Sequence, residues 1–211
     1  MSISSGTSPA RPPVEARLGV LVHPAADRRL ATEHWLLSTH RDPRAARLEW
    51  REHGAALLPL GTLFSAVRIP AALVQVLAGS SALPEVDAFL AEALHGDPVI
   101  CDPRFGTYYA LVPASMPAAW RPDLYGSDTG GYTSDVECLG RGAYLGVPPL
   151  DAVTFRSYTA GTYWSVPMAS PAELCAPLTV ARLIAAGVHR LAGAEIAAAG
   201  QADEPPARDG A

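Results

Sequence analysis

The residues best placed to do chemistry surround a glycine-rich turn in the segment 136–149, VECLGRGAYLGVPP. Gly140 and Gly142 flank Arg141 and allow backbone angles that other residues resist, so a hairpin of two strands is expected over 136–147. Glu137 stands just before the turn. This carboxylate could hold one Mg²⁺ or Mn²⁺ weakly, or it is a solvated acid at the end of a strand. Nucleotidyl transfer by metals would need two or three convergent carboxylates.

Arginines and tyrosines near expected strand ends offer a second chemistry, the binding of a nucleotide. Arg104, Arg141 and Arg156 could hold a phosphate with paired N–H groups, or they keep the surface soluble. Tyrosines can stack on bases, although alternation along a strand sends about half of such a run into the core. The tyrosines in question are Tyr108, Tyr109, Tyr144 and Tyr163.

Several reaction classes are excluded by what the sequence lacks. All 16 basic residues are arginine, which removes Schiff-base chemistry and the lysine of a phosphate-binding loop. The six histidines have no metal-ligand spacing. Cys101-Asp102 could form a nucleophile site, but no histidine is positioned in the sequence to activate the thiol, and a buried strand cysteine is the alternative. The three cysteines are too widely spaced to indicate a disulfide framework or a zinc site, and reduced buried thiols are expected.

The composition indicates one globular domain with polar tails. The chain has 211 residues, of which 49% are hydrophobic and 18% charged. A single domain is expected over 15–199, with disordered tails at 1–14 and 200–211. The net charge of −5 argues against strong non-specific nucleic-acid binding. The first residues lack the apolar core of a signal peptide, and prolines interrupt the apolar segment 55–79, so a cytoplasmic protein without a membrane segment is expected.

The order of the expected elements favours an α+β fold, with helices first, a mainly antiparallel mixed sheet next and a helix last. Asp42-Pro43 is typical of a helix start, and Gly54 of its end. Ser170-Pro-Ala-Glu173 matches a capping box, which predicts one helix there and another from about Leu178 to Ala199. The segment 123–135 is expected to be an exposed polar loop. Other helices are expected over 26–38, 70–78, 84–96 and 113–120, and strands over 55–60, 64–69, 98–101, 107–112 and 162–166.

Four segments follow one another in an order known from a protein family. They are Asp42-Pro43 with Trp50, AALLPLG at 55–61, the aromatic strand 108–113 and the acid–glycine–tyrosine–double-proline segment 136–149. In this order the chain resembles the amino-terminal domain of bifunctional DNA primase/polymerases, of the archaeo-eukaryotic primase superfamily. The resemblance covers about half of the chain and implies a primase/polymerase-like fold.

The metal-binding positions depart from the family pattern. The two acids of the family's catalytic strand correspond to Pro70 and Ala72 here, and its histidine corresponds to Thr107. Only Glu137 matches a family acid. Because proline and alanine cannot bind a metal, the resemblance implies a degenerate site without two-metal chemistry.

Under this hypothesis the former active site binds a nucleotide, a single-stranded nucleic acid or a protein partner. One alternative is an active nucleotidyltransferase with relocated metal ligands, in which Asp97, Asp102 or Asp135 approaches Glu137. A second alternative is a regulatory protein-interaction module, which would expose an apolar patch. The residues expected to line the degenerate site are Arg104, Thr107, Tyr108, Glu137 and Arg141.

Overall fold

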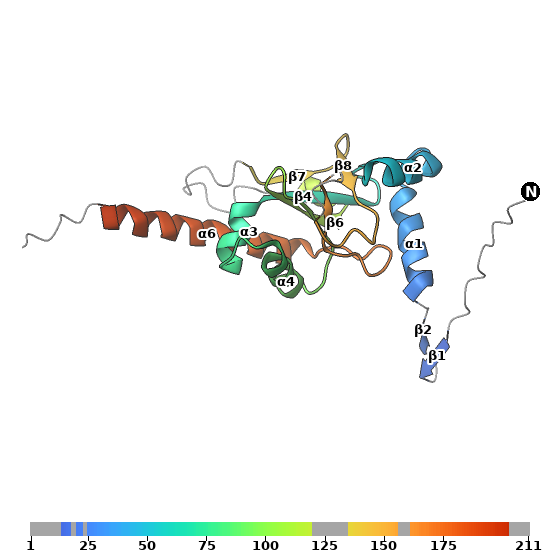
Figure 1. Ribbon diagram of the computed structural model, residues 1–211, viewed down its shortest axis with the longest axis horizontal. Coiled ribbons are helices and arrows are strands. Elements are labelled where there is room, and N and C mark those ends of the chain that lie inside the picture. The colour runs from blue at the N-terminus through green and yellow to red at the C-terminus, as the bar shows by residue number, and fades with distance from the viewer. Residues whose placement is uncertain (1–13, 18–19, 23–24, 120–134, 156–160, 203–211) are drawn as a thin grey trace, which may run out of the picture.

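A computed structural model describes residues 14–17, 20–22, 25–119, 135–155 and 161–202 (Figure 1). The fold is α+β, as the sequence predicts. The elements in chain order are β1 (Val14–Arg17), β2 (Val20–Val22), α1 (Ala25–Leu37), α2 (Pro43–His53), β3 (Ala56–Pro59), β4 (Phe64–Pro70), α3 (Ala71–Ala78), α4 (Leu83–Ala93), β5 (Val99–Asp102), β6 (Thr107–Pro113), α5 (Met116–Ala119), β7 (Glu137–Leu139), β8 (Tyr144–Val147), β9 (Tyr163–Val166) and α6 (Pro177–Ala202).

The main sheet has five strands in the order β7-β4-β6-β5-β9. Every pairing between neighbours in this sheet is antiparallel. The strands β3 and β8 form a separate antiparallel pair, called the ribbon below, in which Leu58 faces Leu145. The strands β1 and β2 form a third pair, which the sequence analysis does not predict.

The prediction of a two-stranded hairpin over 136–147 is wrong, because the two strands join different sheets. β7 adds to the edge of β4, where Glu137 lies opposite Arg68. β8 instead pairs with β3 across the ribbon. The turn between them is closed by a hydrogen bond from the N–H of Ala143 to the carbonyl of Gly140, at 3.0 Å. A local turn signal carries no information about which strand each of its flanking segments will pair with.

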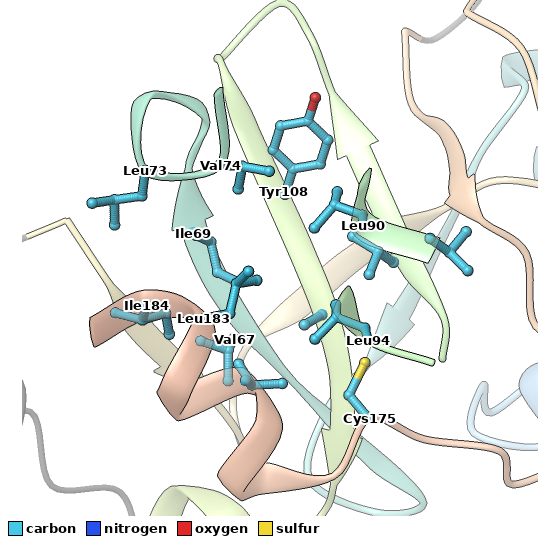
Figure 2. Packing of buried hydrophobic residues seen from close by; sticks show 14 of the residues in the cluster. Val67, Ile69, Leu73, Val74, Leu90, Leu94, Tyr108, Cys175, Leu183 and Ile184 are labelled. Carbon is cyan, nitrogen blue, oxygen red and sulfur yellow. The ribbon is translucent and has the colours of Figure 1, made fainter. Parts of the chain in front are cut away.

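Two hydrophobic cores lie on the two faces of the main sheet. The helix-side core packs α3, α4 and α6 against one face, and Figure 2 shows part of it. The ribbon-side core packs α1, α2 and the ribbon against the other face. Members of the helix-side core include Val67, Ile69, Leu73, Val74, Leu90, Tyr108 and Ile184; members of the ribbon-side core include Leu36, Trp50, Leu58, Phe64, Ala66, Leu145 and Trp164.

The ends of α2 form as predicted. The side chain of Asp42 accepts hydrogen bonds from the N–H groups of Arg44 and Ala45, at 2.9 and 3.2 Å. Pro43 occupies the first helical position, and Gly54 ends the helix with φ at +72°. These signals lie within a few residues of each other, so the local sequence is sufficient to specify them.

The predicted capping box at Ser170 does not start a helix. The carboxylate of Glu173 does accept hydrogen bonds from the N–H groups of Ser170 and Ala169, at 3.0 and 3.2 Å. However, Ala172 has φ at +61°, a conformation that no helix can contain. One helix, α6, then begins at Pro177 and replaces the two that were expected.

The expected tails and the loop 123–135 fall mostly outside the described residues, although β1 begins at Val14 and α6 continues to Ala202. The apolar segment 55–79 forms β3, β4 and α3, as predicted. Among the described residues, no single helix is long and apolar enough to cross a bilayer; the pair α3 and α4, bent by 85°, meets the length and composition criteria only when joined.

Candidate functional site

A cavity of about 790 Å³ opens at the end of the main sheet where β4 meets α3. It lies on the ribbon-side face, because Arg68 and Tyr109 face each other across β4 and β6, and Pro70 faces Thr107. On β4, the described residues of the ribbon-side core reach only as far as Ala66. The residues that line this open cavity are Arg68, Pro70, Ala71, Ala72, Phe105, Gly106, Thr107, Tyr109 and Asp135.

Arg68 provides the positive charge of the open cavity. Its Nη2 lies 3.3 Å from Oε2 of Glu137, the residue opposite it on β7. Its Nε donates a hydrogen bond to the carbonyl oxygen of Asp135 at 3.3 Å. The Arg68 and Glu137 side chains are 39% and 55% exposed, so water screens the ion pair and a bound anion could compete for the guanidinium.

A second charged pair lies beside the cavity, at the end of β5. The backbone N–H and Nε of Arg104 donate to Oδ1 of Asp102, at 3.1 and 3.4 Å, and Nη2 donates to Oδ2 at 3.4 Å. The Asp102 carboxylate is buried, so this arginine supplies the compensation that a buried charge requires. The Arg104 guanidinium also lies 5.8 Å from the ring centre of Phe105.

Phe105 is the most exposed aromatic side chain of the cavity. It is 76% exposed in the turn between β5 and β6. Thr107, the first residue of β6, is buried and its hydroxyl donates to the carbonyl oxygen of Phe105 at 3.0 Å. The N–H of Ala71 donates to the carbonyl of Gly106 at 2.7 Å and ties this turn to the start of α3. An exposed aromatic ring on an anchored turn is suited to stacking against a flat ligand.

Tyr108 does not belong to the open cavity, which corrects one predicted site residue. Neighbouring residues of a strand face opposite sides, so Thr107 and Tyr109 face the open cavity while Tyr108 enters the helix-side core. Figure 2 shows its hydroxyl pointing away from Val67 and Ile184. Burial raises the pKa of this phenol above its ordinary value, so the group stays neutral.

Arg141 also lies away from the cavity. It occupies the turn between β7 and β8, and its backbone contacts the turn that precedes β4. A Cβ atom at Gly61 would lie 2.5 Å from the Arg141 nitrogen. The prediction that Arg141 lines the site assumed a hairpin, and that assumption is wrong because β8 leaves the main sheet to pair with β3.

Of the five predicted site residues, Thr107 therefore lines the open cavity, Glu137 adjoins it through Arg68, and Arg104 adjoins it through Phe105. The sequence analysis missed Arg68 and Phe105, and it named Tyr109 only among four tyrosines that could stack on bases, not among the residues expected to line the site. For Tyr109 a signal was present, because period-two alternation pairs Thr107 with Tyr109 and not with Tyr108. For Arg68 no signal was present, because its facing partner comes from a strand 69 residues later in the chain.

The acids considered as relocated metal ligands lie in different places. Asp97 accepts a hydrogen bond from the N–H of Ala176 at 3.4 Å, near the start of α6, and Asp102 is occupied by Arg104. Only Asp135 shares the cavity wall near Glu137. Within the part of the chain that the structure describes, no three His, Cys, Asp or Glu side chains group to hold a metal ion.

The helix-side face carries a polar cluster without a competent nucleophile. The Asp87 carboxylate accepts hydrogen bonds from the hydroxyls of Ser165 and Tyr163, the latter at 3.0 Å. Desolvation raises the pKa of Asp87, and it raises the pKa of the buried Cys101 thiol to about 12. Since the thiolate is the reactive form, Cys101 fits the alternative of a buried strand cysteine. All three cysteines are free thiols.

A scan against protein-family models and searches of curated proteins and of solved structures find no match to this chain. The site must therefore be interpreted from its own geometry. It combines an exposed aromatic ring, a second aromatic side chain, a solvent-accessible guanidinium and two carboxylates around a cavity of about 790 Å³. Such a set can bind a flat, anionic ligand.

Proposed function

We propose that this chain is a primase/polymerase-like domain without a catalytic metal centre, and that its open cavity binds a nucleotide, either free or within a single strand. Phe105 and Tyr109 would contact the base and Arg68 would contact a phosphate. In this proposal the domain acts in the cytoplasm as a binding module.

The observation that carries the proposal is that the three positions which the resemblance relates to family metal-site residues lie around one cavity. The resemblance relates Pro70 and Ala72 to family acids and Thr107 to the family histidine, and all three line the open cavity. Glu137, the one retained acid, adjoins them through its ion pair with Arg68. An arrangement of this kind is expected if a former active site has lost its metal ligands and kept its binding surface.

The chemistry of the cavity wall supports a nucleotide as the ligand. Stacking on an aromatic side chain contributes about 1–3 kcal/mol per base, and it tolerates any base. A guanidinium is planar and matches a phosphate with two parallel N–H donors. Phe105, in the turn between β5 and β6, and Arg68, on β4, supply these two contacts to the same cavity.

The test is binding of a labelled single-stranded oligonucleotide and of a nucleoside triphosphate, at low and moderate salt, with and without Mg²⁺ or Mn²⁺. We expect binding that does not need a metal ion and that weakens with salt. Phe105→Ala should weaken it by about 5- to 150-fold, which corresponds to the loss of one stacking contact. The matched control is Leu57→Ala, since Leu57 is also an exposed apolar residue, 60% exposed, on the outer face of the ribbon.

Failure to bind either probe, or an equal loss in the two variants, would contradict the proposal. Binding that requires a divalent metal would instead favour the alternative of an active nucleotidyltransferase. The protein-interaction alternative is favoured by one specific observation, the exposure of Leu57 and Tyr144 on the ribbon. This alternative predicts that the chain binds no nucleotide, and that replacing Leu57 and Tyr144 by alanine abolishes binding to a protein partner.

A further inference from the structure

A second cavity, of about 520 Å³, lies between α1 and α2 and is called the α1–α2 cavity. It is close to the opposite end of β4 from the open cavity, because Trp35 of α1 packs on Phe64, the first residue of β4, with ring centres 5.6 Å apart. Figure 1 shows α1 and α2 at one end of the sheet and α3 at the other. The cavity is lined by Arg29, Glu33, Arg47, Trp50, Arg51, Pro149 and Asp151.

Both acids of the α1–α2 cavity are occupied by a single arginine. Nε of Arg29 lies 3.2 Å from Oε1 of Glu33, and its Nη2 lies 3.4 Å from Oδ2 of Asp151. The hydrogen bond that Arg29 donates to Glu33 is the largest of several contacts that raise the pKa of Arg29. This arginine therefore links α1 to the segment after β8 and offsets one of the two negative charges of the lining.

Two further arginines of the lining have no acidic partner. Arg47 and Arg51 are one turn apart on α2, so their side chains lie on the same face of the helix. Neither makes an ion pair within the described residues. Like charges at this spacing destabilise a helix, and an anion between them would remove the repulsion.

The wall that carries these arginines is held firmly. The buried Trp50 lies between them in the sequence, and its indole N–H donates to the carbonyl of Val147 at 2.8 Å. Oε2 of Glu49 accepts a hydrogen bond from the N–H of Leu57 at 3.0 Å, which fixes the same helix to the ribbon. A ligand would therefore meet guanidinium groups on a prepared scaffold and lose little affinity in ordering it.

We propose that the α1–α2 cavity binds a dianionic phosphate group between Arg47 and Arg51. Arg47 and Arg51 have no ion-pair partner in the described part of the chain, and the lining as a whole holds three guanidinium groups and two carboxylates, a net charge of +1. Their paired N–H donors match the oxygens of a phosphate monoester, which carries about −1.5 to −2 at neutral pH, better than the single charge of a carboxylate. The group could be a free phosphate or the terminal 5′-phosphate of a nucleic-acid strand. This inference does not rest on the proposed function, because the two cavities share no lining residue.

The experiment compares three probes by calorimetry: inorganic phosphate, a 5′-phosphorylated oligothymidylate and the same strand with a 5′-hydroxyl. We expect the 5′-phosphorylated strand to bind at least tenfold more tightly than the 5′-hydroxyl strand. Arg47→Gln and Arg51→Gln should each remove that difference, and the lysine variants should retain part of it. Tight binding of inorganic phosphate with no added affinity for the strand would support the site and identify free phosphate as its ligand.

The matched control is Arg44→Gln, on the same helix but outside the cavity lining. It should change each affinity by less than about twofold. Equal affinity for the two strands together with no binding of inorganic phosphate would overturn the proposal. An equal loss in the Arg44 and Arg47 variants would also overturn it, since the helix would then attract anions through its general charge. Phe105→Ala should leave the gain from the 5′-phosphate unchanged, which separates this site from the open cavity.

Discussion

Arg68 on β4 lies directly opposite Glu137 on β7, and the two side chains approach to 3.3 Å. Glu137, the one acid that the resemblance relates to a family acid, is thus paired with an arginine. A cation in this position opposes the binding of a divalent metal at the same carboxylate by Coulomb repulsion. The pair also restrains the guanidinium that the proposed function uses for phosphate.

Breaking this pair should affect binding more than stability. In Glu137→Gln, Arg68 loses its partner, and we expect a nucleoside triphosphate to bind several-fold more tightly. The free energy of unfolding should change by less than about 1 kcal/mol, as for other exposed ion pairs. Calorimetry and urea denaturation measure the two effects. Glu92→Gln on α4 is the control with the same change in charge, and weaker binding by the Glu137 variant would show that the carboxylate itself contacts the ligand.

The crossing of α3 and α6 depends on a glycine. A Cβ atom at Gly187 would lie 2.7 Å from the carbonyl oxygen of Leu73, whereas one at Gly193 on the same helix would have no atom within 4 Å. Gly187→Ala should therefore destabilise the protein by about 1–3 kcal/mol through overpacking. Gly193→Ala should be neutral or stabilising by up to about 1 kcal/mol, because alanine favours a helix.

Urea denaturation of both glycine variants checks this prediction. The substitutions are chemically identical, so helix propensity alone cannot give them opposite signs. Equal stability of the two variants would mean that α6 does not approach α3 at Leu73.

Alkaline pH should destabilise the fold through its buried acids. Desolvation raises the pKa of Cys101 from an ordinary 9.0 to about 12, so the folded protein keeps a proton that the unfolded chain releases. The stabilisation is complete below pH 9 and is lost as the pH rises toward 12, by up to about 1.4 kcal/mol per pH unit. Tyr108 and Tyr163 shift in the same direction.

This pH dependence is measured by urea denaturation at pH 8 and pH 10. Cys101→Ala should lose less stability between these values than the wild-type protein. Cys138→Ala should also lose less stability than the wild-type protein, since desolvation raises the pKa of that half-buried thiol to about 11, which is still above pH 10. An identical decrease in the wild-type protein and the Cys101 variant would contradict the assignment.

The elements that the sequence predicts correctly depend on nearby residues. Asp42, Pro43 and Gly54 define both ends of α2 within the helix itself. Short runs of mostly apolar residues that end at a proline predict β4 and β6, which end at Pro70 and Pro113. The capping box at Ser170 is an instructive exception: its hydrogen bond from Ser170 to Glu173 forms, yet the backbone at Ala172 turns away from a helix.

The candidate site likewise contains residues that the sequence analysis proposed and residues that only the tertiary structure brought to the cavity. Thr107 was proposed because the resemblance relates it to the family histidine, and Glu137 because it stands just before the glycine-rich turn and matches a family acid. The structure places Thr107 in the lining of the open cavity and Glu137 beside it, paired with Arg68. Tyr108 was misassigned because two neighbouring residues of one strand were assigned to the same face. Arg141 was misassigned because a turn was taken as proof that the strands beside it pair.

By itself, the sequence determined the fold class, the start and end of α2, most strand positions and the absence of lysine chemistry. Tertiary structure decided which strands pair, and so it brought Arg68 to Glu137 and separated β7 from β8. It also brought Arg47 and Arg51 beside two acids that Arg29 contacts. The physical reason is that helix caps and turns are stabilised by interactions between neighbouring residues. Strand pairing and ion pairs instead depend on contacts between residues that lie far apart in the chain.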